Sequence, residues 1–252
     1  RQQYNFRKEL FQLRHSQKEF EHQIEKSSIN HLEFKDFNFS QNLYKKYMQT
    51  LFMLSFSTPF ANASQLPQSL LNPYFQSLPN SQWSFIKGGV FSYLETILAN
   101  SNMNIICNAK NLKVERKTDV VHIKCNEEKQ TYDKIIIATT PGSVKNLLND
   151  MSDQESKIFN DWSDQKFKTI AHKDVSFYEP YKNVKKTPMD LFFQFPKSNV
   201  GYNTYQNNVY QIKTREHYSF SHNLDKIILK DSIIHEANHI VPHYTKTCLL
   251  YT

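Results

Sequence analysis

Residues 132–142 read Tyr-Asp-Lys-Ile-Ile-Ile-Ala-Thr-Thr-Pro-Gly and are central to the expected fold. The three consecutive isoleucines predict a strand over 134–138 that is buried on both faces, as in a parallel sheet. The strand ends at Ala138 and Thr139, small residues that precede a Pro-Gly turn. In many α/β proteins such an ending brings the backbone close to a nucleotide. The stretch therefore favours a nucleotide-binding layer.

The residues on either side of this stretch predict a compact series of short elements. A helix is expected after Gly88-Gly89, where apolar residues recur at helical spacing as far as Leu98. Short strands are expected over 104–108, 112–116 and 119–125, with Cys107 and Cys125 in the core. A further helix begins at 143, and Ser152-Asp-Gln-Glu155 is a capping-box pattern that opens the next one.

The two ends of the chain predict different kinds of secondary structure. The amino-terminal part predicts helices over 1–29 and 36–57 and a third helix from about Ser64. Beyond residue 165 the chain is rich in Tyr and Phe and predicts an antiparallel sheet, with strands over 167–178, 189–195, 200–212 and 218–220. The fold class is therefore mixed α/β, and we place domain boundaries near Asn80 and Asp150.

Composition narrows the class of protein. The chain has 252 residues and a formal net charge of +7, spread along the sequence without a long basic stripe, so no nucleic-acid partner is indicated. No apolar run is long enough to span a bilayer, and the three cysteines lack metal-ligand spacing. The chain begins with Arg1 rather than Met and contains only four glycines, so we expect a piece of a longer protein.

Taken together, residues 83–150 resemble the flavin-dependent amine oxidase superfamily. The shared order is Gly-Gly, an apolar helix, a strand that ends in Arg, a β-meander, an acidic residue, an apolar strand and Ala-Thr-Pro. In this chain the markers of that order are Gly88-Gly89, Arg116, Asp133 and 138–141. The amino-terminal Gly-x-Gly-x-x-Gly motif of that superfamily and its carboxy-terminal flavin-facing segment have no counterpart here, which accounts for the shortage of glycine.

The resemblance implies a mixed α+β chain with an incomplete FAD-binding domain over 81–150. The substrate domain would combine a helical part, 1–80, with an antiparallel sheet, 151–252. FAD would contact Asn111, Leu112, Ala138 and Thr139 and would accept a hydride from a C–N or C–C bond of a small-molecule substrate. The resemblance names no catalytic residue, and this part of the protein alone is not expected to hold FAD tightly. Substrate, electron acceptor and oligomeric state stay open.

Two other functions remain open. His235-Glu236-Ala237-Asn238-His239 matches the His-Glu-x-x-His pattern, which on a helix places two imidazoles on one face to bind zinc, although Pro242 would end such a helix at once. We favour coincidence, and expect no metal site. The other alternative is a non-catalytic relative that acts as an interaction module. His172 and Asp174, on one face of a predicted strand, are a candidate acid–base pair, although surface or interface positions are the simpler expectation.

Overall fold

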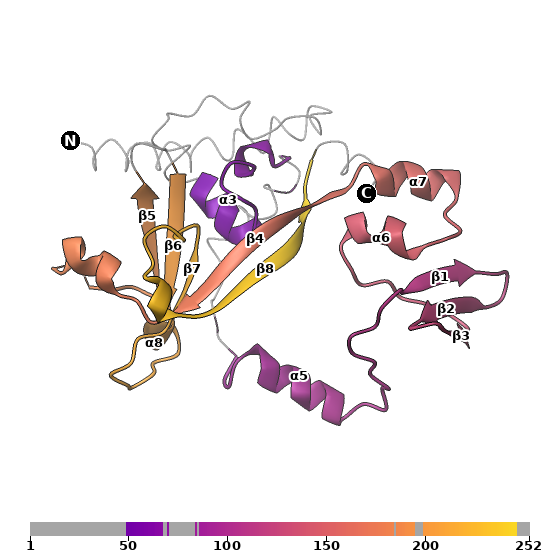
Figure 1. The fold of residues 1–252 in the computed structure, drawn as a ribbon, viewed down its shortest axis with the longest axis horizontal. Coiled ribbons are helices and arrows are strands. Elements are labelled where there is room, and N and C mark those ends of the chain that lie inside the picture. Colours follow the sequence, from indigo (N-terminus) through magenta and orange to yellow (C-terminus); the bar gives the residue numbers. More distant parts are fainter. Residues whose placement is uncertain are drawn as a thin grey trace, which may run out of the picture. The chain divides into compact units, whose positions relative to one another are not determined.

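The computed structural model describes residues 49–67, 70, 84, 86–183, 185–194 and 199–245. These residues belong to two compact units, here called unit 1 (up to 79 and from 165 onward) and unit 2 (80–164). Figure 1 shows their elements. Among the described residues, no helix combines the length and the apolar character needed to cross a bilayer. The predicted helices over 1–29 and most of 36–57 lie outside the described residues, but α3 (Gln49–Phe56) confirms the end of the second one.

Unit 2 is built on an antiparallel β-meander. Strands β1 (Lys113–Arg116), β2 (Val121–Cys125) and β3 (Glu128–Tyr132) pair in that order. Helices α6 (Pro141–Leu147) and α7 (Asp153–Asn160) lie beside the meander, and α5 (Val90–Ala99) precedes it (Figure 1). The core holds Val114, Val121, Val144 and Leu148, all at most 7% exposed. The capping box of α7, the helix at 90 and the strands at 112 and 119 are confirmed.

The isoleucine run does not form the buried strand that the sequence predicts. No strand among the described residues pairs with 134–138, and the side chain of Ile136 is 92% exposed. Ile135 and Ile137 pack against the unit 2 core, so only one side of the isoleucine run is partly buried. A strand needs a hydrogen-bonding neighbour, and the described part of the chain supplies none here. The predicted strand over 104–108 is likewise absent.

The two cysteines of unit 2 are not in the core. Cys107 is exposed and Cys125 is half-buried. Cys107 loses its cover because the segment that contains it is not part of a sheet. Cys125 is the last residue of β2, where the meander turns, so little packs against it.

Unit 1 contains a five-stranded sheet in the order β5-β6-β7-β4-β8. The strands are β4 (Ser163–His172), β5 (Met189–Gln194), β6 (Asn199–Tyr205), β7 (Ser219–His222) and β8 (Ile233–His243). Three short helices lie between consecutive strands: η5 (Ser176–Tyr181), α8 (Gln206–Val209) and η6 (Lys230–Ser232). A further one, η3 (Ala63–Gln65), follows α3. The pairs β5–β6, β6–β7 and β7–β4 are antiparallel, as expected. The expected mixed α/β class is confirmed.

Side chains alternate between the two faces of this sheet, and each face is covered. On one face, Met53 of α3 packs with Phe167 and Tyr202. On the other face, Ile170 packs with Leu224 and Ile228. The alternation follows from the two-residue period of a strand. Both faces therefore hold buried side chains.

Two predicted strands of unit 1 are too long. The strand predicted over 167–178 ends at His172, and 176–181 instead forms the 3₁₀ helix η5. The strand predicted over 200–212 ends at Tyr205, where α8 begins. Aromatic residues explain the first error, because Tyr and Phe favour strands but Phe177 here packs onto Phe192 of the sheet from a helical turn. The assignment of 1–80, 81–150 and 151–252 to a substrate domain and an FAD-binding domain stays a prediction.

Candidate functional site

The two segments predicted to contact a nucleotide start from the same small core. Val114, two residues after Leu112, and Ile137, one residue before Ala138, belong to the unit 2 cluster. The side chains of Asn111, Leu112, Ala138 and Thr139 are all exposed. Residues 111–112 and 138–139 therefore adjoin the same hydrophobic core, while their own side chains are exposed to solvent.

The turn before β1 is held in a defined shape. The backbone N–H of Lys110 donates to Oδ1 of Asn126 (2.7 Å), and the N–H of Asn126 donates to the carbonyl of Lys110 (2.9 Å). Asn111 has φ +54°, the left-handed region that Asn tolerates better than most residues. This geometry turns the chain sharply at Asn111, so the exposed residues 111 and 112 are presented on a fixed backbone.

The loop that follows Thr139 is occupied by a carboxylate of the protein itself. Thr140 Oγ1 donates to Oδ2 of Asp164 (3.1 Å), and Ser143 Oγ lies 3.4 Å from the same oxygen. A Cβ on Gly142 would meet Oδ1 of Asp164 at 2.7 Å, so the carboxylate lies directly beside this glycine. Because Asp164 already places negative charge at the start of α6, a nucleotide phosphate is not expected there. Within this loop, the predicted nucleotide contact is therefore limited to the exposed residues 138 and 139.

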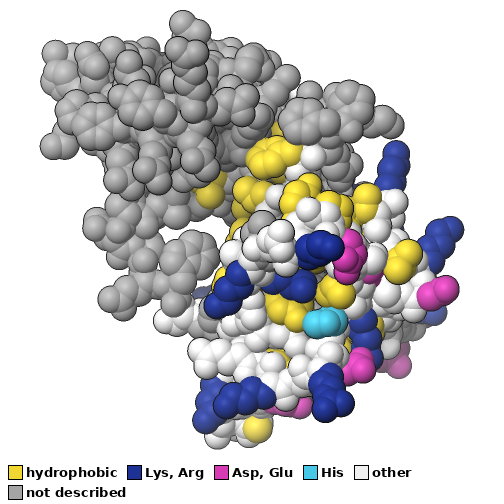
Figure 2. Space-filling view, turned by 90° about the vertical axis from the view of Figure 1, so that its left-hand side faces the viewer, with side chains coloured by type: hydrophobic (Ala, Val, Ile, Leu, Met, Phe, Trp, Pro, Cys, Tyr) yellow, Lys and Arg dark blue, Asp and Glu magenta, His cyan; other side chains and the backbone are white. Residues whose placement is uncertain are grey.

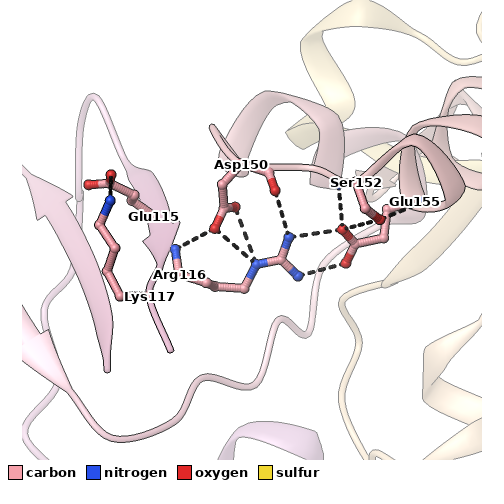
Figure 3. Close-up of polar contacts among 6 residues, drawn as sticks. All are labelled: Glu115, Arg116, Lys117, Asp150, Ser152 and Glu155. Carbon is pink, nitrogen blue, oxygen red and sulfur yellow. Dashed lines mark hydrogen bonds and ion pairs between the residues drawn. The ribbon is translucent and has the colours of Figure 1, made fainter. Parts of the chain in front are cut away.

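Arg116 ties the end of β1 to the start of α7 (Figure 3). Its Nη1 and Nη2 donate to the two carboxylate oxygens of Glu155 (2.6 and 2.9 Å), while Nε lies 3.2 Å from Asp150 Oδ1. Glu155 also accepts the backbone N–H of Ser152 (2.9 Å), which completes the capping box. Arg116 therefore links β1 to α7, and its guanidinium group is already bound to two carboxylates rather than available to a phosphate.

The pKa values of the carboxylates in this group are lowered. Hydrogen bonds from Arg116 and then from the Ser152 backbone lower the pKa of Glu155 to about 2. Burial opposes ionisation of Asp150, but the hydrogen bonds from the side chain and backbone of Arg116 outweigh it and lower that pKa too. All three groups are charged at neutral pH, so the group acts as a fixed ionic clamp with no free acid or base.

Unit 1 holds a second polar group, a row of side chains that crosses the sheet. The register aligns Asp190 of β5 with Asn203 of β6, and Asn203 with Ser221 of β7. Ser221 Oγ donates to Oδ1 of Asn203 (2.7 Å), Asn203 Nδ2 donates to the Tyr178 hydroxyl (2.9 Å), and Tyr178 donates to Oδ2 of Asp190 (2.7 Å). Asn203 and Ser221 are fully buried. Their hydrogen bonds offset the free-energy cost of burying polar groups away from water.

His172 and Asp174 are buried, which corrects the expectation that they lie at the surface. His172 is 0% exposed, and its Nε2 lies 2.8 Å from Ser221 Oγ. Its Nδ1 has no hydrogen-bond partner among the described residues, so no bond joins it to Asp174 there. Asp174 instead accepts the backbone N–H groups of Ser176 (2.7 Å) and Leu229 (2.8 Å). The two residues therefore do not form a hydrogen-bonded acid–base pair.

The protonation of both residues follows from this setting. Burial lowers the pKa of His172, against the pull of the Asp174 charge, so the imidazole is neutral at pH 7. Burial alone would raise the pKa of Asp174, but the hydrogen bonds from Leu229 and Ser176 lower it. Asp174 is thus a charged loop anchor, and His172 is a neutral member of the polar row.

The His-Glu-x-x-His pattern lies on a strand. His235 and His239 belong to β8, which pairs in the sheet beside β4, and Glu236 binds Lys168 (2.9 Å). Four residues of extended strand span roughly 13 Å, whereas zinc ligands lie about 2 Å from one ion. The zinc helix is therefore wrong. Apolar β-branched residues on both sides of the motif, together with Pro242, favour a strand. The described residues contain no group of three or more side chains that could hold a metal ion.

Comparison with known proteins identifies the kind of fold. No family model and no curated protein sequence matches the chain. Among solved structures, the chain is similar to a CLA-producing fatty acid isomerase from P. acnes, with a TM-score of 0.51 and 12% identity. The match covers 84% of this chain and 54% of the isomerase. The chain thus spans about half the length of that enzyme, and at this identity the likeness concerns the fold alone.

Two features of these groups escaped the sequence analysis. The capping box at Ser152 was visible, but its partner Arg116 lies 39 residues from Glu155 and has no local signal. The polar row had a weak signal, since Asn203 and Ser221 are polar positions in otherwise aromatic strands. Only the strand register brings them together.

Proposed function

We propose that unit 2 is part of the FAD-binding layer of an FAD-dependent oxidoreductase related to the flavin amine oxidases. The observation that carries this proposal is the exposure of three apolar segments of unit 2. In α5, no residue is buried, and Phe91 is 71% exposed. Ile105 and Ile106 are 54% and 53% exposed, and Ile136 is 92% exposed.

These three segments are the ones that the family resemblance assigns to the nucleotide-binding sheet and its covering helix. Burial of one isoleucine side chain stabilises a protein by about 1.5–3 kcal/mol, so several exposed together favour a missing neighbour. Large exposed apolar patches generally mark a surface that binds another element or another chain. The further strands of an FAD-binding domain would supply that neighbour. The likeness to a longer enzyme, of which the match covers 54%, supports this.

The residues of unit 2 fit one end of FAD. The fixed turn at Asn111 with Leu112, and the exposed small residues Ala138 and Thr139, would hold the adenosine part through backbone groups. The pyrophosphate needs a glycine-rich cradle, and Gly142 is not part of one, because Asp164 fills the space beside it. FAD, when bound, supplies hydride acceptance. The residues of this chain bind and orient it.

The substrate class is the finer part of the proposal. The similar structure is an isomerase of fatty acids, which favours a C–C bond of an apolar substrate over the C–N bond of an amine. The remaining alternative is a relative that keeps the fold and has lost the cofactor. The exposed apolar segments fit both, since either protein would complete the sheet.

The test is the flavin content of the complete polypeptide that carries this sequence. We expect bound FAD, seen as flavin absorbance in the visible range after gel filtration. Ala138→Arg places a long side chain where the backbone should meet the nucleotide, and we expect it to lower FAD occupancy at least tenfold. Thr131→Arg, at an exposed position of β3, is the matched control and should keep its flavin.

Two outcomes would count against the proposal. A colourless polypeptide that takes up no added FAD would favour the interaction module. Equal flavin content in Ala138→Arg and Thr131→Arg would show that FAD binds elsewhere. Reduction of bound flavin by a long-chain unsaturated acid but not by an alkylamine would support the C–C alternative.

A further inference from the structure

Unit 1 has an open pocket of about 400 Å³ along β5, the edge strand of its sheet. Its volume falls in the range of small-molecule sites. Figure 2 faces the side on which β5 and η5 lie in Figure 1, and shows hydrophobic side chains among Lys and Arg side chains. The lining comes from η5, the segment after it and β5: Tyr178, Tyr181, Lys185, Asp190, Leu191, Phe192 and Phe193.

The pocket has apolar walls that remain open to solvent. Tyr181 is 52% exposed, and Leu191 and Phe193 are each 39% exposed. The ring of Phe192 stands edge-on to Tyr178 (5.3 Å, 79°) and to Tyr181 (6.3 Å, 71°). These aromatic contacts set rigid walls, so an apolar ligand body would be buried without rearrangement of the pocket.

The charges in and around the pocket leave one cation available. Asp190 is satisfied, because it accepts hydrogen bonds from the Tyr178 hydroxyl (2.7 Å) and from Thr187 Oγ1 (2.6 Å). The Nζ of Lys186 lies over the rings of Tyr178 (5.2 Å) and Tyr205 (5.8 Å). Lys185 is exposed and has no ion-pair partner within the described part of the chain. The pocket therefore offers an apolar wall with one unpaired ammonium group.

We propose that this pocket binds an amphipathic anion, a carboxylate carried on an apolar body. The carboxylate pairs with Lys185, and the apolar body covers Tyr181, Leu191 and Phe193. Lys185 and Lys186 repel an organic cation of the same shape, and the Asp190 carboxylate, which would attract one, already accepts hydrogen bonds from Tyr178 and Thr187. The proposal does not depend on flavin, since every group in it belongs to unit 1 and none is assigned to FAD.

The test uses the full chain and dodecanoate below the concentration at which it forms micelles. Isothermal titration calorimetry should show saturable binding of dodecanoate and none of dodecyltrimethylammonium, which has the same tail and the opposite charge. Lys185→Met keeps the apolar stem and removes the charge, so affinity should fall about tenfold, the effect of one lost charge-assisted hydrogen bond. Lys185→Arg should bind within about threefold of wild type.

Two more variants complete the design. Lys182→Met removes a neighbouring exposed lysine that does not line the pocket, and it should leave affinity unchanged. Leu191→Ser shortens the apolar wall at an exposed position and should weaken binding about fivefold, with an unchanged circular dichroism spectrum. Equal affinity in Lys185→Met and Lys182→Met would overturn the proposal, and so would equal binding of both detergents. Binding only to vesicles containing phosphatidylserine, and not to monomeric dodecanoate, would assign the surface to a bilayer instead.

Discussion

Replacement of Arg116 by Met tests whether the ionic clamp holds unit 2 together. The pKa of Glu155 falls from 4.5 to about 2, mainly through Arg116, which corresponds to about 3 kcal/mol in favour of the ionised form. The side chains of Arg116 and Glu155 are 33% and 29% exposed, so solvent screening reduces the net effect to about 1–2 kcal/mol. We expect Arg116→Met to lower the free energy of unfolding of unit 2 by that amount at pH 7.

Trp162 provides the assay, because it belongs to unit 2 and is 5% exposed. Urea unfolding would be followed by its fluorescence in a Trp83→Phe background, in which it is the only tryptophan. Lys117→Met is the matched control: it removes the neighbouring positive charge of an exposed lysine, which pairs with the half-buried Glu115. That control should leave the urea midpoint unchanged.

The pH dependence separates the clamp from a general loss of packing. Because the folded-state pKa of Glu155 is depressed, its stabilisation is complete above pH 4.5 and is lost as the pH falls toward about 2. The difference between wild type and Arg116→Met should therefore shrink across that window. An unchanged difference at pH 2.5, or an equal midpoint shift in Lys117→Met, would refute the reasoning.

Three further predictions concern unit 1. Burial of His222 between two aromatic rings lowers its pKa to about 4. The free energy of unfolding should therefore fall as the pH drops from 6.5 to 4. His222→Phe should weaken this pH dependence in urea unfolding experiments. Asn203→Leu leaves the buried hydroxyl groups of Tyr178 and Ser219 without their amide partner, so the free energy of unfolding, measured in urea, should fall by about 2–4 kcal/mol. Asn208→Ala, at an exposed position, is the control and should lower it by less than about 0.5 kcal/mol. A Cβ on Gly201 would overlap the Leu224 side chain, so Gly201→Ala should lower the free energy of unfolding by about 1–3 kcal/mol. Because Leu224→Ala removes the overlapping atoms, the double variant should lose less stability than the sum of the two single variants.

Local patterns in the sequence predicted the elements whose formation depends on neighbours a few residues away. The capping box at Ser152 and the helical period after Gly89 are contacts within one or two turns, so they appear in the structure where expected. The meander followed from alternation around Val121. The mixed α/β class came from the same short-range signals.

The candidate site was only partly visible in this way. Asn111 and Ala138 were selected from their place in a family pattern, and the structure adds that both segments leave one core with exposed side chains. Whether they contact FAD stays a prediction. That Lys185 has no ion-pair partner within the described residues could not be recognised from sequence, because it depends on which carboxylates other residues already bind.

Short-range patterns predicted local elements: helices, turns and strands whose hydrogen bonds and apolar faces recur over short spacing. The pairing of strands became clear from the fold. Among the described residues no strand lies beside Ile136, His235 and His239 lie far apart on an extended strand, and Asp190, Asn203 and Ser221 align across three strands. The physical reason is that strand pairing, ion pairing and burial join residues distant in sequence, so their free energy depends on register and packing that no local window contains.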